Sequence, residues 1–598
     1  MNEIKYEIAA LISEAVKKRF HAEMSAETLE GYLEVPPEKN MGDYAFPCFR
    51  LSRELKLAPP QIAGELSKTI NSISTYTMPK NIMDSDVEIN HKFNNSKFII
   101  AKQMGGYLNM DLNRAQVAHR TIGAVLEGNY GASDIGSGKT VCIDYSSINI
   151  AKRFHIGHLS TTMIGHSLKR IYDYLGYQTV GINHLGDWGT QFGKLISAYK
   201  RWGTREEVEK EGVEALTRLY VRFHEESAKE VDEQGTHTLE DEGRMYFKAI
   251  EDGNQEALDI FNWFKAVTLR DCEKTYNMLG VSFDSYNGEA FYNDKMQPVI
   301  DALKEKGLLS VSEGASVVDL EAEGMPPCLI LKKDGATLYA TRDLAAAMYR
   351  ADTYHFDKCL YVVAYQQDLH FRQVFEVLKK MGFSWAENMV HVSFGMVSYE
   401  GQTLSTRKGH IVYLDDLLKQ AQEKALKIIE EKSPDLADKP TVARQVGVGA
   451  VIYTVLQNNR IKDIDFWWNR ALNFDGESGP YVQYTHARCC SVLRKAEAAD
   501  IDAEPDYASL ADDAAGELVA LLSRFPETVY DAAAKYEPSM VTRAVTDIAQ
   551  AYNRFYYDNR ILDDNPAVRA ARVLLTRATR DVLKQGMYLI GMEAPEAM

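Results

Sequence analysis

The chain has 598 residues, which at about 150 residues per domain predicts several domains and excludes a small binding module. Hydrophobic residues make up 45% and charged residues 26% of the sequence, a composition typical of globular proteins that excludes global disorder and fibrous repeats. The net charge of −17 predicts weak non-specific attraction to nucleic acid.

None of the seven cysteines belongs to a C-x-x-C pair, which argues against a disulfide framework and a zinc ribbon and favours a reducing cytosol. The N-terminal stretch carries Glu3, Glu7 and Glu14 among its apolar positions, so it lacks the uninterrupted core of a secretory signal. No apolar run approaches the ~18 residues needed to span a bilayer. We therefore expect a cytoplasmic protein without a membrane partner.

The first elements predicted along the chain form a small α+β module. Apolar residues among the first twelve repeat with the period of a helix. In GDYAFPCF the residues Tyr44, Phe46 and Cys48 alternate as they would on one face of a strand. Pro60 stands where it can open a further helix, because its missing N–H costs nothing in the first turn.

A β-α-β unit is predicted from Thr140 onward. TVCIDYSS is typical of a buried strand, and apolar residues from Leu159 to Leu175 then repeat at intervals of three and four. Gly176 is placed to end that helix, and YQTVGIN indicates the next strand. Such a unit builds a parallel sheet, and these sheets bind nucleotides at their carboxyl edge.

The remaining sequence divides into helical and strand-rich parts. Residues 204–280 are charge-rich and have a helical period, which predicts an insertion between strands. Strand patterns return at GVSFDSY, SVVDL, PCLILKK, KCLYVVAY and MVHVSFGMVSY. After about residue 470 they disappear, which predicts a separate all-α domain.

The string His155-Ile156-Gly157-His158 stands where the β-α-β unit enters its helix. Two imidazoles at a helix N-terminus can donate to phosphate oxygens, which the helix dipole also attracts. Gly157 leaves room for a nucleotide ring against the backbone. Taken alone the string is weak, and two surface histidines at a helix start are the alternative.

A basic string, Ser405-Thr406-Arg407-Lys408, follows the strand pattern FGMVSY. Adenylate formation expels pyrophosphate from the α-phosphate of ATP, and cations can stabilise the charge that develops. A solvated basic turn is the alternative for this string in isolation. The two strings in this order, within one α/β domain, resemble the class I aminoacyl-tRNA synthetases.

Several longer stretches resemble one family of that class, the arginyl-tRNA synthetases. They are DYSSINIAK from Asp144, NHLGDWGTQFG from Asn183, YATRD from Tyr339, QQDLH from Gln366 and GPYVQYTHAR from Gly479. The ending GMEAPEAM is similar as well. Ordered matches along the whole chain make chance an inadequate explanation.

The resemblance implies a multidomain α/β fold with three parts. An additional N-terminal α+β domain that touches the tRNA is expected over residues 1–115. A Rossmann-type parallel-sheet catalytic domain is expected over 116–470, with its helical insertion near 204–280. An α-helical anticodon-binding bundle is expected over 471–598, and the protein is expected to be a monomer.

Five residues are implied to bind L-arginine. A guanidinium needs acidic partners and an aromatic wall, and Tyr339 and Asp343 are spaced to share one helix face. In the family, the positions of Tyr339, Asp343 and Gln367 contact the substrate side chain, and those of Asp144 and Asn149 hold the region of its α-amino group. A helix N-cap is the alternative role for Asp343.

The resemblance also assigns the residues that handle ATP. His155 and His158 are expected to hold its phosphates, and Lys152, Arg407 and Lys408 to offset charge on the leaving pyrophosphate. Mg²⁺ is expected to accompany ATP, without a tightly bound metal site in the protein. The further residues implied to bind ATP are Gly157, Ser405 and, along the adenine edge, Met396 and Val397.

The RNA-reading residues are implied to lie near the end of the chain. Tyr556, Tyr557 and Arg560 can stack on unpaired anticodon bases and meet phosphates. At least one of these tyrosines is expected to belong to the helix core. Met598 is implied to contact tRNA(Arg) as well. Because the chain is acidic overall, tRNA binding predicts a basic face on an otherwise acidic surface.

The sequence departs from the family pattern at four positions. Ile148 replaces the usual Pro, Arg153 stands where Pro or Glu is commoner, and Asp144 where Glu is frequent. Thr403 marks the missing leading lysine of the basic loop, a loss for which Lys152 is the implied compensation. These departures keep open a catalytically inactive RNA-binding paralogue. A different class I synthetase and a small-molecule adenylating enzyme are two further hypotheses.

Overall fold

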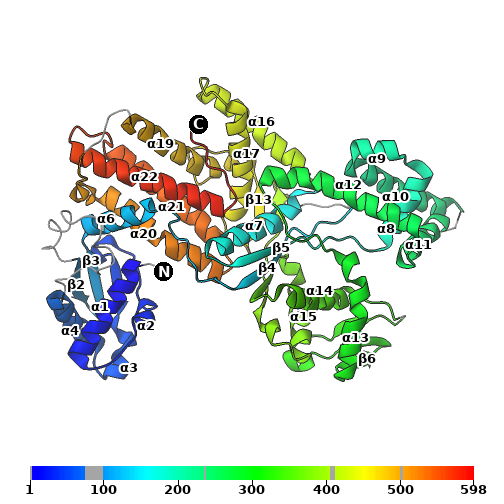
Figure 1. Ribbon diagram of the computed structural model, residues 1–598, viewed down its shortest axis with the longest axis horizontal. Helices are drawn as coiled ribbons and strands as arrows, with labels where there is room; N and C mark the ends of the chain where they lie inside the picture. The colour runs from blue at the N-terminus through cyan, green and yellow to red at the C-terminus, as the bar shows by residue number, and fades with distance from the viewer. Residues whose placement is uncertain (1–2, 74–97, 235–236, 334, 404–410, 498–502) are drawn as a thin grey trace.

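The computed structural model describes residues 3–73, 98–234, 237–333, 335–403, 411–497 and 503–598. Figure 1 shows an elongated molecule with a small N-terminal module at one end and a projecting group of helices at the other. A parallel sheet lies between them, and the C-terminal helices pack above the N-terminal module. The expected multidomain α/β fold is confirmed.

The N-terminal module is built on an antiparallel sheet in the order β1-β3-β2. Its main elements are α1 (Glu3–Phe20), α2 (Ala26–Glu30), β1 (Tyr44–Pro47), α3 (Ser52–Leu55), α4 (Pro59–Ile73), β2 (Ile99–Met104) and β3 (Tyr107–Leu112). The helices expected at the chain start and near Pro60 are confirmed. Tyr44, Phe46 and Cys48 all belong to the main core cluster, but the strand is shorter than the pattern predicts, because β1 ends at Pro47 and Cys48 begins a 3-10 turn.

The central sheet is parallel throughout, in the order β10-β9-β4-β5. Its strands are β4 (Thr140–Asp144), β5 (Gln178–Ile182), β9 (Lys358–Tyr361) and β10 (Met389–His391), and α7 (Leu159–Tyr174) joins the first two. The predicted β-α-β unit is therefore confirmed. Gly176 follows α7 with φ of 82°, a left-handed conformation that favours glycine.

One expected strand is absent from the described residues. The segment GVSFDSY makes an isolated bridge between Ser285 and Ile182. The Asp284 carboxylate accepts the Gly181 N–H at 2.7 Å, and that donor is then unavailable to a neighbouring strand. Three main-chain hydrogen bonds still join Gly181 and Asn183 to Asp284 and Ser285, but the pairing is a single bridge and does not form a further strand of the sheet.

The helical insertion begins earlier than expected, at Thr190. It comprises α8 (Thr190–Trp202), α9 (Arg205–Glu211), α10 (Val213–Gln234), α11 (Thr238–Glu251) and α12 (Gln255–Leu279), which project from the sheet in Figure 1. The chain then forms η5 (Glu289–Lys295), α13 (Met296–Glu305), an antiparallel sheet of β6 (Leu309–Ser312), β7 (Ala315–Val318) and β8 (Cys328–Leu331), α14 (Tyr339–Tyr354), the 3-10 turn η7 (Tyr365–Gln367) and α15 (Asp368–Lys380).

A small sheet and two long helices lead into the C-terminal part. They are β11 (Val397–Tyr399), β12 (Gln402–Thr403), α16 (Leu414–Lys432), α17 (Lys439–Leu456), β13 (Ile464–Phe466) and the short α18 (Trp468–Ala471). Every residue of α17 from Val446 to Leu456 is buried, as expected of a helical segment that is apolar all round.

The C-terminal part is the expected helical bundle. It consists of α19 (Gly479–Glu497), α20 (Asp513–Ala534), α21 (Ser539–Asp558) and α22 (Pro566–Leu589), against which α6 (Arg114–Leu126) also packs. Among the helices of the described residues, none combines the length and apolar character needed to cross a bilayer.

Candidate active site

The sequence motifs gather at the carboxyl edge of the central sheet. Strand β4 ends at Asp144, β5 at Ile182 and β9 at Tyr361, and these three residues lie in register across the sheet. The loops that follow them carry the two histidines, the turn beginning at Asn183, and Gln367. This edge is where parallel sheets bind their ligands.

The loop that follows β4 is held in an unusual backbone conformation. Ser146, Ser147 and Ala151 have φ values of 71°, 44° and 60°, and such left-handed residues cost about 1–3 kcal/mol each. Two contacts from α12 support the loop. The Ser146 and Tyr276 hydroxyls are 2.8 Å apart, and the Ala151 N–H donates to Thr268 Oγ1 at 3.1 Å. The helical insertion thus shapes the approach to the histidines.

His155 and His158 form a compact pair at the start of α7. Their ring centroids are 3.9 Å apart. The Gly157 N–H donates to His155 Nδ1 at 3.1 Å, and the His155 N–H donates to His158 Nδ1 at 3.3 Å. Because both Nδ1 atoms accept, each neutral ring carries its proton on Nε2. Both rings therefore have an Nε2–H to donate.

Both histidines stay neutral at physiological pH. Burial, and then the nearby charge of Lys152, lower the pKa of His155. Burial, with a smaller contribution from His155, lowers the pKa of His158 to about 3. Lys152 itself is exposed beside the pair. The site thus offers two neutral donors and one nearby cation to an anionic ligand.

Asp144 is buried, and each of its two carboxylate oxygens accepts a hydrogen bond. It accepts a hydrogen bond from Arg350 Nη2 at 2.7 Å and another from the Ser147 hydroxyl at 2.8 Å. Arg350 is 1% exposed and reaches Asp144 from α14. A substrate amino group would have to share these oxygens. Sequence patterns gave no signal for Arg350.

Asp343 lies on the first turns of α14, which begins at Tyr339 as the spacing required. The N-cap alternative is wrong, because Leu338 is the N-cap and Asp343 lies a full turn inside the helix. Its Oδ2 is 2.6 Å from His370 Nε2. Tyr339 and Gln367 are exposed. His370, to which sequence patterns assigned no role, fixes one side of the Asp343 carboxylate.

Glu289 is an acidic residue of this region that sequence reasoning missed. It begins η5, is half-buried, and lies 3.5 Å from Arg342 Nη1. Burial raises its pKa to about 7; Arg342 opposes the shift, and the charges of Asp343 and Asp187 add to it. A short 3-10 turn has no periodicity that would have predicted this placement.

Buried contacts hold the turn that follows β5. Asp187 is fully buried and pairs with Lys265 of α12 at 2.6 Å. A Cβ at Gly186 would collide with Asn149 Oδ1, so glycine there permits the close approach of Asn149, which is itself exposed. Trp188 packs edge-on against two phenylalanines of the insertion, so its ring contributes to the packing of this turn.

The segment expected to meet adenine uses some of its main-chain groups internally. The Met396 N–H donates to Asp463 Oδ1 at 2.7 Å, and the Met396 carbonyl accepts from the Ile464 N–H at 2.8 Å. The Met396 N–H is therefore already paired, while its carbonyl oxygen keeps a second acceptor position. Main-chain pairing with adenine remains a prediction for Val397.

The basic string, with Ser405, Arg407 and Lys408, lies outside the described residues. Thr403 ends β12 and pairs with Ser398 of β11. Among the residues that are described, no group of three or more His, Cys, Asp or Glu side chains is arranged to hold a metal ion.

The residues expected to meet RNA lie at the end of α21. Tyr557 is 89% exposed and Tyr556 is 43% exposed. The expectation that one of them belongs to the core is wrong, because Tyr552, one turn earlier, takes the buried position. Arg560 is exposed and pairs with Asp564 at 2.9 Å.

Two further residues extend this surface, and one expected residue does not. The Arg488 guanidinium lies 4.9 Å from the ring of Tyr484 and 5.0 Å from the ring of Tyr556. Sequence patterns assigned no role to Tyr484 or Arg488. Met598 lies apart from these residues and packs, partly buried, against the apolar cluster between α16 and α17; its contact with tRNA stays a prediction.

Comparison with known proteins gives matches along the whole chain. Family models match for a class I tRNA synthetase (R) catalytic domain over residues 120–468, a DALR anticodon-binding domain over 482–598 and an arginyl-tRNA synthetase N-terminal domain over 6–81. The arginine–tRNA ligase of Clostridioides difficile is 48% identical over 98% of this chain and 99% of its own length, and that of Alkaliphilus metalliredigens is 49% identical over 95% of each. The structure of Thermus thermophilus arginyl-tRNA synthetase superposes with a TM-score of 0.79, covers 99% of both chains, and is 24% identical.

Proposed function

Since the chain belongs to the arginyl-tRNA synthetase family, we propose that it joins L-arginine to the 3′ end of tRNA(Arg) in an ATP-dependent reaction. The arginine carboxylate attacks the α-phosphate of ATP, giving arginyl-adenylate and pyrophosphate. The terminal ribose hydroxyl of the tRNA then takes the arginyl group and releases AMP. The full-length similarity to arginine–tRNA ligases carries this proposal.

Activation relies on positioning the two substrates and on stabilising the charge that develops, with no covalent enzyme intermediate. The Nε2–H groups of His155 and His158 donate to ATP phosphate oxygens at the N-terminus of α7, where anions are favoured. Lys152, Arg407 and Lys408 offset charge on the departing pyrophosphate. Mg²⁺ enters with ATP as part of the substrate. Gly157, Ser405 and Val397 complete the proposed nucleotide contacts.

The arginine site follows from the carboxylates near the same sheet edge. Asp343 meets the substrate guanidinium, held in place by His370, and Glu289 adds a second negative charge as arginine binds. Tyr339 and Gln367 complete the side-chain contacts. Asp144 and Asn149 hold the α-amino region, with Asp144 sharing the oxygens it already gives to Arg350 and Ser147.

We propose that the N-terminal module and the C-terminal helical bundle both bind the tRNA. We assign the anticodon to Tyr556, Tyr557 and Arg560, joined by Tyr484 and Arg488. The module of residues 1–115 touches the body of the tRNA, 116–470 performs the chemistry, and 471–598 reads the anticodon. We further propose a cytoplasmic monomer, and the seven buried free thiols support a reducing compartment.

Amino-acid selectivity tests the proposed reaction. The purified chain is expected to charge tRNA(Arg) with L-arginine and to reject L-citrulline, which has arginine's shape without its charge. L-lysine is also expected to fail, because a point charge cannot meet carboxylates bidentately. Charging with citrulline at a comparable rate would contradict the carboxylate-based arginine site.

A pH dependence of arginine binding follows from Glu289. Its pKa of about 7 means that the carboxyl is neutral below pH 7 and becomes a partner for the guanidinium above it. The KM for arginine is therefore expected to fall roughly tenfold between pH 6 and 8. Burial lowers the pKa of both histidines of the pair, so their titration moves to lower pH than that of Glu289. Glu289→Gln should have a flat profile, and a wild-type slope in that variant would contradict the assignment.

The anticodon surface gives a prediction on tRNA affinity. Replacing Tyr557 by Ala is expected to weaken tRNA(Arg) binding by about tenfold to hundredfold, since base stacking on an aromatic ring contributes about 1–3 kcal/mol. The side chain is 89% exposed, so folding should be unaffected. Filter binding measures the change, with Tyr530→Ala on α20, an exposed tyrosine, as the control. An equal loss in both variants would remove the specific role of Tyr557.

A further inference from the structure

The two-histidine segment is joined to the chain that leads into α16. Two main-chain hydrogen bonds of 2.9 Å, from Ile156 N–H to the Val412 carbonyl and from Leu414 N–H to the Phe154 carbonyl, flank an antiparallel bridge at His155. The histidine segment therefore depends on a strip of chain more than 250 residues away for its position.

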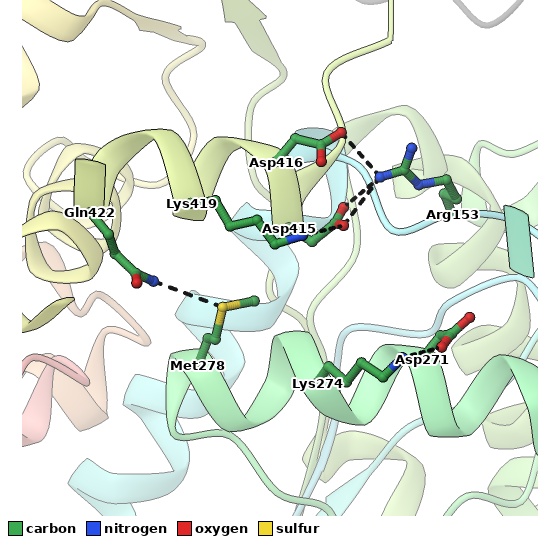
Figure 2. Close-up of polar contacts among 8 residues, drawn as sticks. All are labelled: Arg153, Asp271, Lys274, Met278, Asp415, Asp416, Lys419 and Gln422. Atoms are coloured by element: carbon green, nitrogen blue, oxygen red, sulfur yellow. Dashed lines mark hydrogen bonds and ion pairs between the residues drawn. The ribbon is translucent and has the colours of Figure 1, made fainter. Parts of the chain in front are cut away.

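Arg153 reinforces this junction with its side chain. Its Nη2 lies 3.0 and 3.1 Å from the two oxygens of Asp415 and 3.0 Å from Asp416 Oδ2. Its guanidinium also stacks 3.7 Å from the ring centroid of Tyr413. Figure 2 shows the guanidinium facing both aspartates at the first turn of α16.

The ion pairs of Arg153 are less exposed than a typical surface ion pair, and its guanidinium also stacks on a ring. Its side chain is 21% exposed and that of Asp415 is 31% exposed, so solvent screens the pair less than it screens an exposed one. The planar guanidinium both stacks and donates, which a lysine cannot reproduce.

We propose that Arg153 is a positioning residue, which holds His155 and His158 in the geometry that ATP requires by tying their segment to the first turn of α16. This inference rests on the proposed function. Misplacing a catalytic group by about 1 Å can cost about a hundredfold in rate. The residues proposed to meet the arginine side chain come from η5, α14 and η7 instead, so the guanidinium contacts do not depend on this tie.

The first test replaces Arg153 by Ala and measures arginine-dependent ATP–pyrophosphate exchange in the presence of tRNA(Arg). The kcat is expected to fall about tenfold, equivalent to about 1.4 kcal/mol, while the KM for arginine changes less than about twofold. Arg153→Lys, which keeps the charge but loses the stack, is expected to recover part of the rate. The thermal midpoint of each variant is measured on the same preparation.

A matched control lies in the same part of the molecule. Lys274 pairs with Asp271 at 2.7 Å along the exposed face of α12 and is also drawn in Figure 2. This pair joins neighbouring turns of one helix and does not reach the histidine segment. Lys274→Ala is therefore expected to leave kcat unchanged, and a tenfold loss there would show that any charge lost in this region has the same effect.

A double-mutant cycle separates positioning from a general loss of stability. The Asp415→Asn, Asp416→Asn variant should lose about as much kcat as Arg153→Ala, and the triple variant should lose no more than either. Additive losses, an unchanged kcat in Arg153→Ala, or a loss explained entirely by a lower thermal midpoint would overturn the proposal. Failure of the proposed function is distinguishable, because the wild-type chain would then show no exchange.

Discussion

Replacing Asp343 by Asn is expected to raise the KM for L-arginine by about 30- to 100-fold while leaving the KM for ATP nearly unchanged. The substitution keeps the shape of the side chain but removes its charge, and a hydrogen bond to a charged partner contributes about 1.5–3 kcal/mol. Asp343 lies on α14 and the histidine pair lies at the start of α7, so the substitution should not change the KM for ATP. Pyrophosphate exchange, with each substrate varied in turn, measures both constants.

The control for Asp343 stands on the same helix. Asp352, further along α14, is exposed, and Asp352→Asn should leave both KM values as they are. His370→Ala offers an independent check, because it removes the 2.6 Å hydrogen bond to Asp343 without changing the carboxylate. It should raise the KM for arginine by less than Asp343→Asn does. Equal increases in the KM for arginine and for ATP in Asp343→Asn would remove its role in the arginine site.

Loss of His158 is expected to reduce kcat for arginine activation by about 10²- to 10³-fold, as removal of a preorganised donor does at other charge-stabilising sites. His158→Ala removes the Nε2–H donor and also the acceptor of the His155 N–H. His158→Gln keeps an N–H donor near the Nε2 position and should recover part of the rate. The KM for arginine should change little in either variant.

His166 provides the comparison for a histidine on the same helix. It is buried in α7, and its ring nitrogens have no hydrogen-bond partner among the described residues. His166→Gln tests disturbance of α7 away from the phosphates, and its kcat per folded enzyme should stay close to that of the wild type. A kcat within threefold of the wild type in His158→Ala would contradict the proposed contact with ATP.

Local patterns predicted the framework of the site correctly. The period of α7, the stop at Gly176 and the two flanking strands are determined by neighbours in the sequence, so local patterns were enough to predict the β-α-β unit. The start of α14 at Tyr339 places Tyr339 and Asp343 in one helix, which was the condition for their expected common face. Once the parallel sheet was expected, its carboxyl edge fixed where His155 would lie.

The long-range partners could not be predicted from such patterns. Arg350 reaches Asp144 across 206 residues, and Arg153 reaches Asp415 across 262. Nothing in the local spacing pairs these groups, because the pairing arises only after the elements pack. The raised pKa of Glu289 has the same origin, since it depends on the burial of η5 and on charges from two other segments.

Exposure was also mispredicted where several candidates shared one helix. The aromatic run of α21 includes Tyr552, Tyr556 and Tyr557, and the sequence indicates that one face must be buried. Which tyrosine takes that face depends on how α21 rotates against its neighbours, and the structure buries Tyr552. Both tyrosines proposed to stack on anticodon bases consequently keep exposed rings.

Arginine-dependent ATP–pyrophosphate exchange, run with and without tRNA(Arg), tests the central claim most directly. The chain is expected to catalyse exchange when the tRNA is present, which would show that the departures at Asp144, Ile148, Arg153 and Thr403 are compatible with activation. The similarity of the whole chain to arginine–tRNA ligases supports this outcome. An absence of exchange under both conditions, with tRNA(Arg) still bound, would contradict the account and identify a catalytically inactive RNA-binding paralogue.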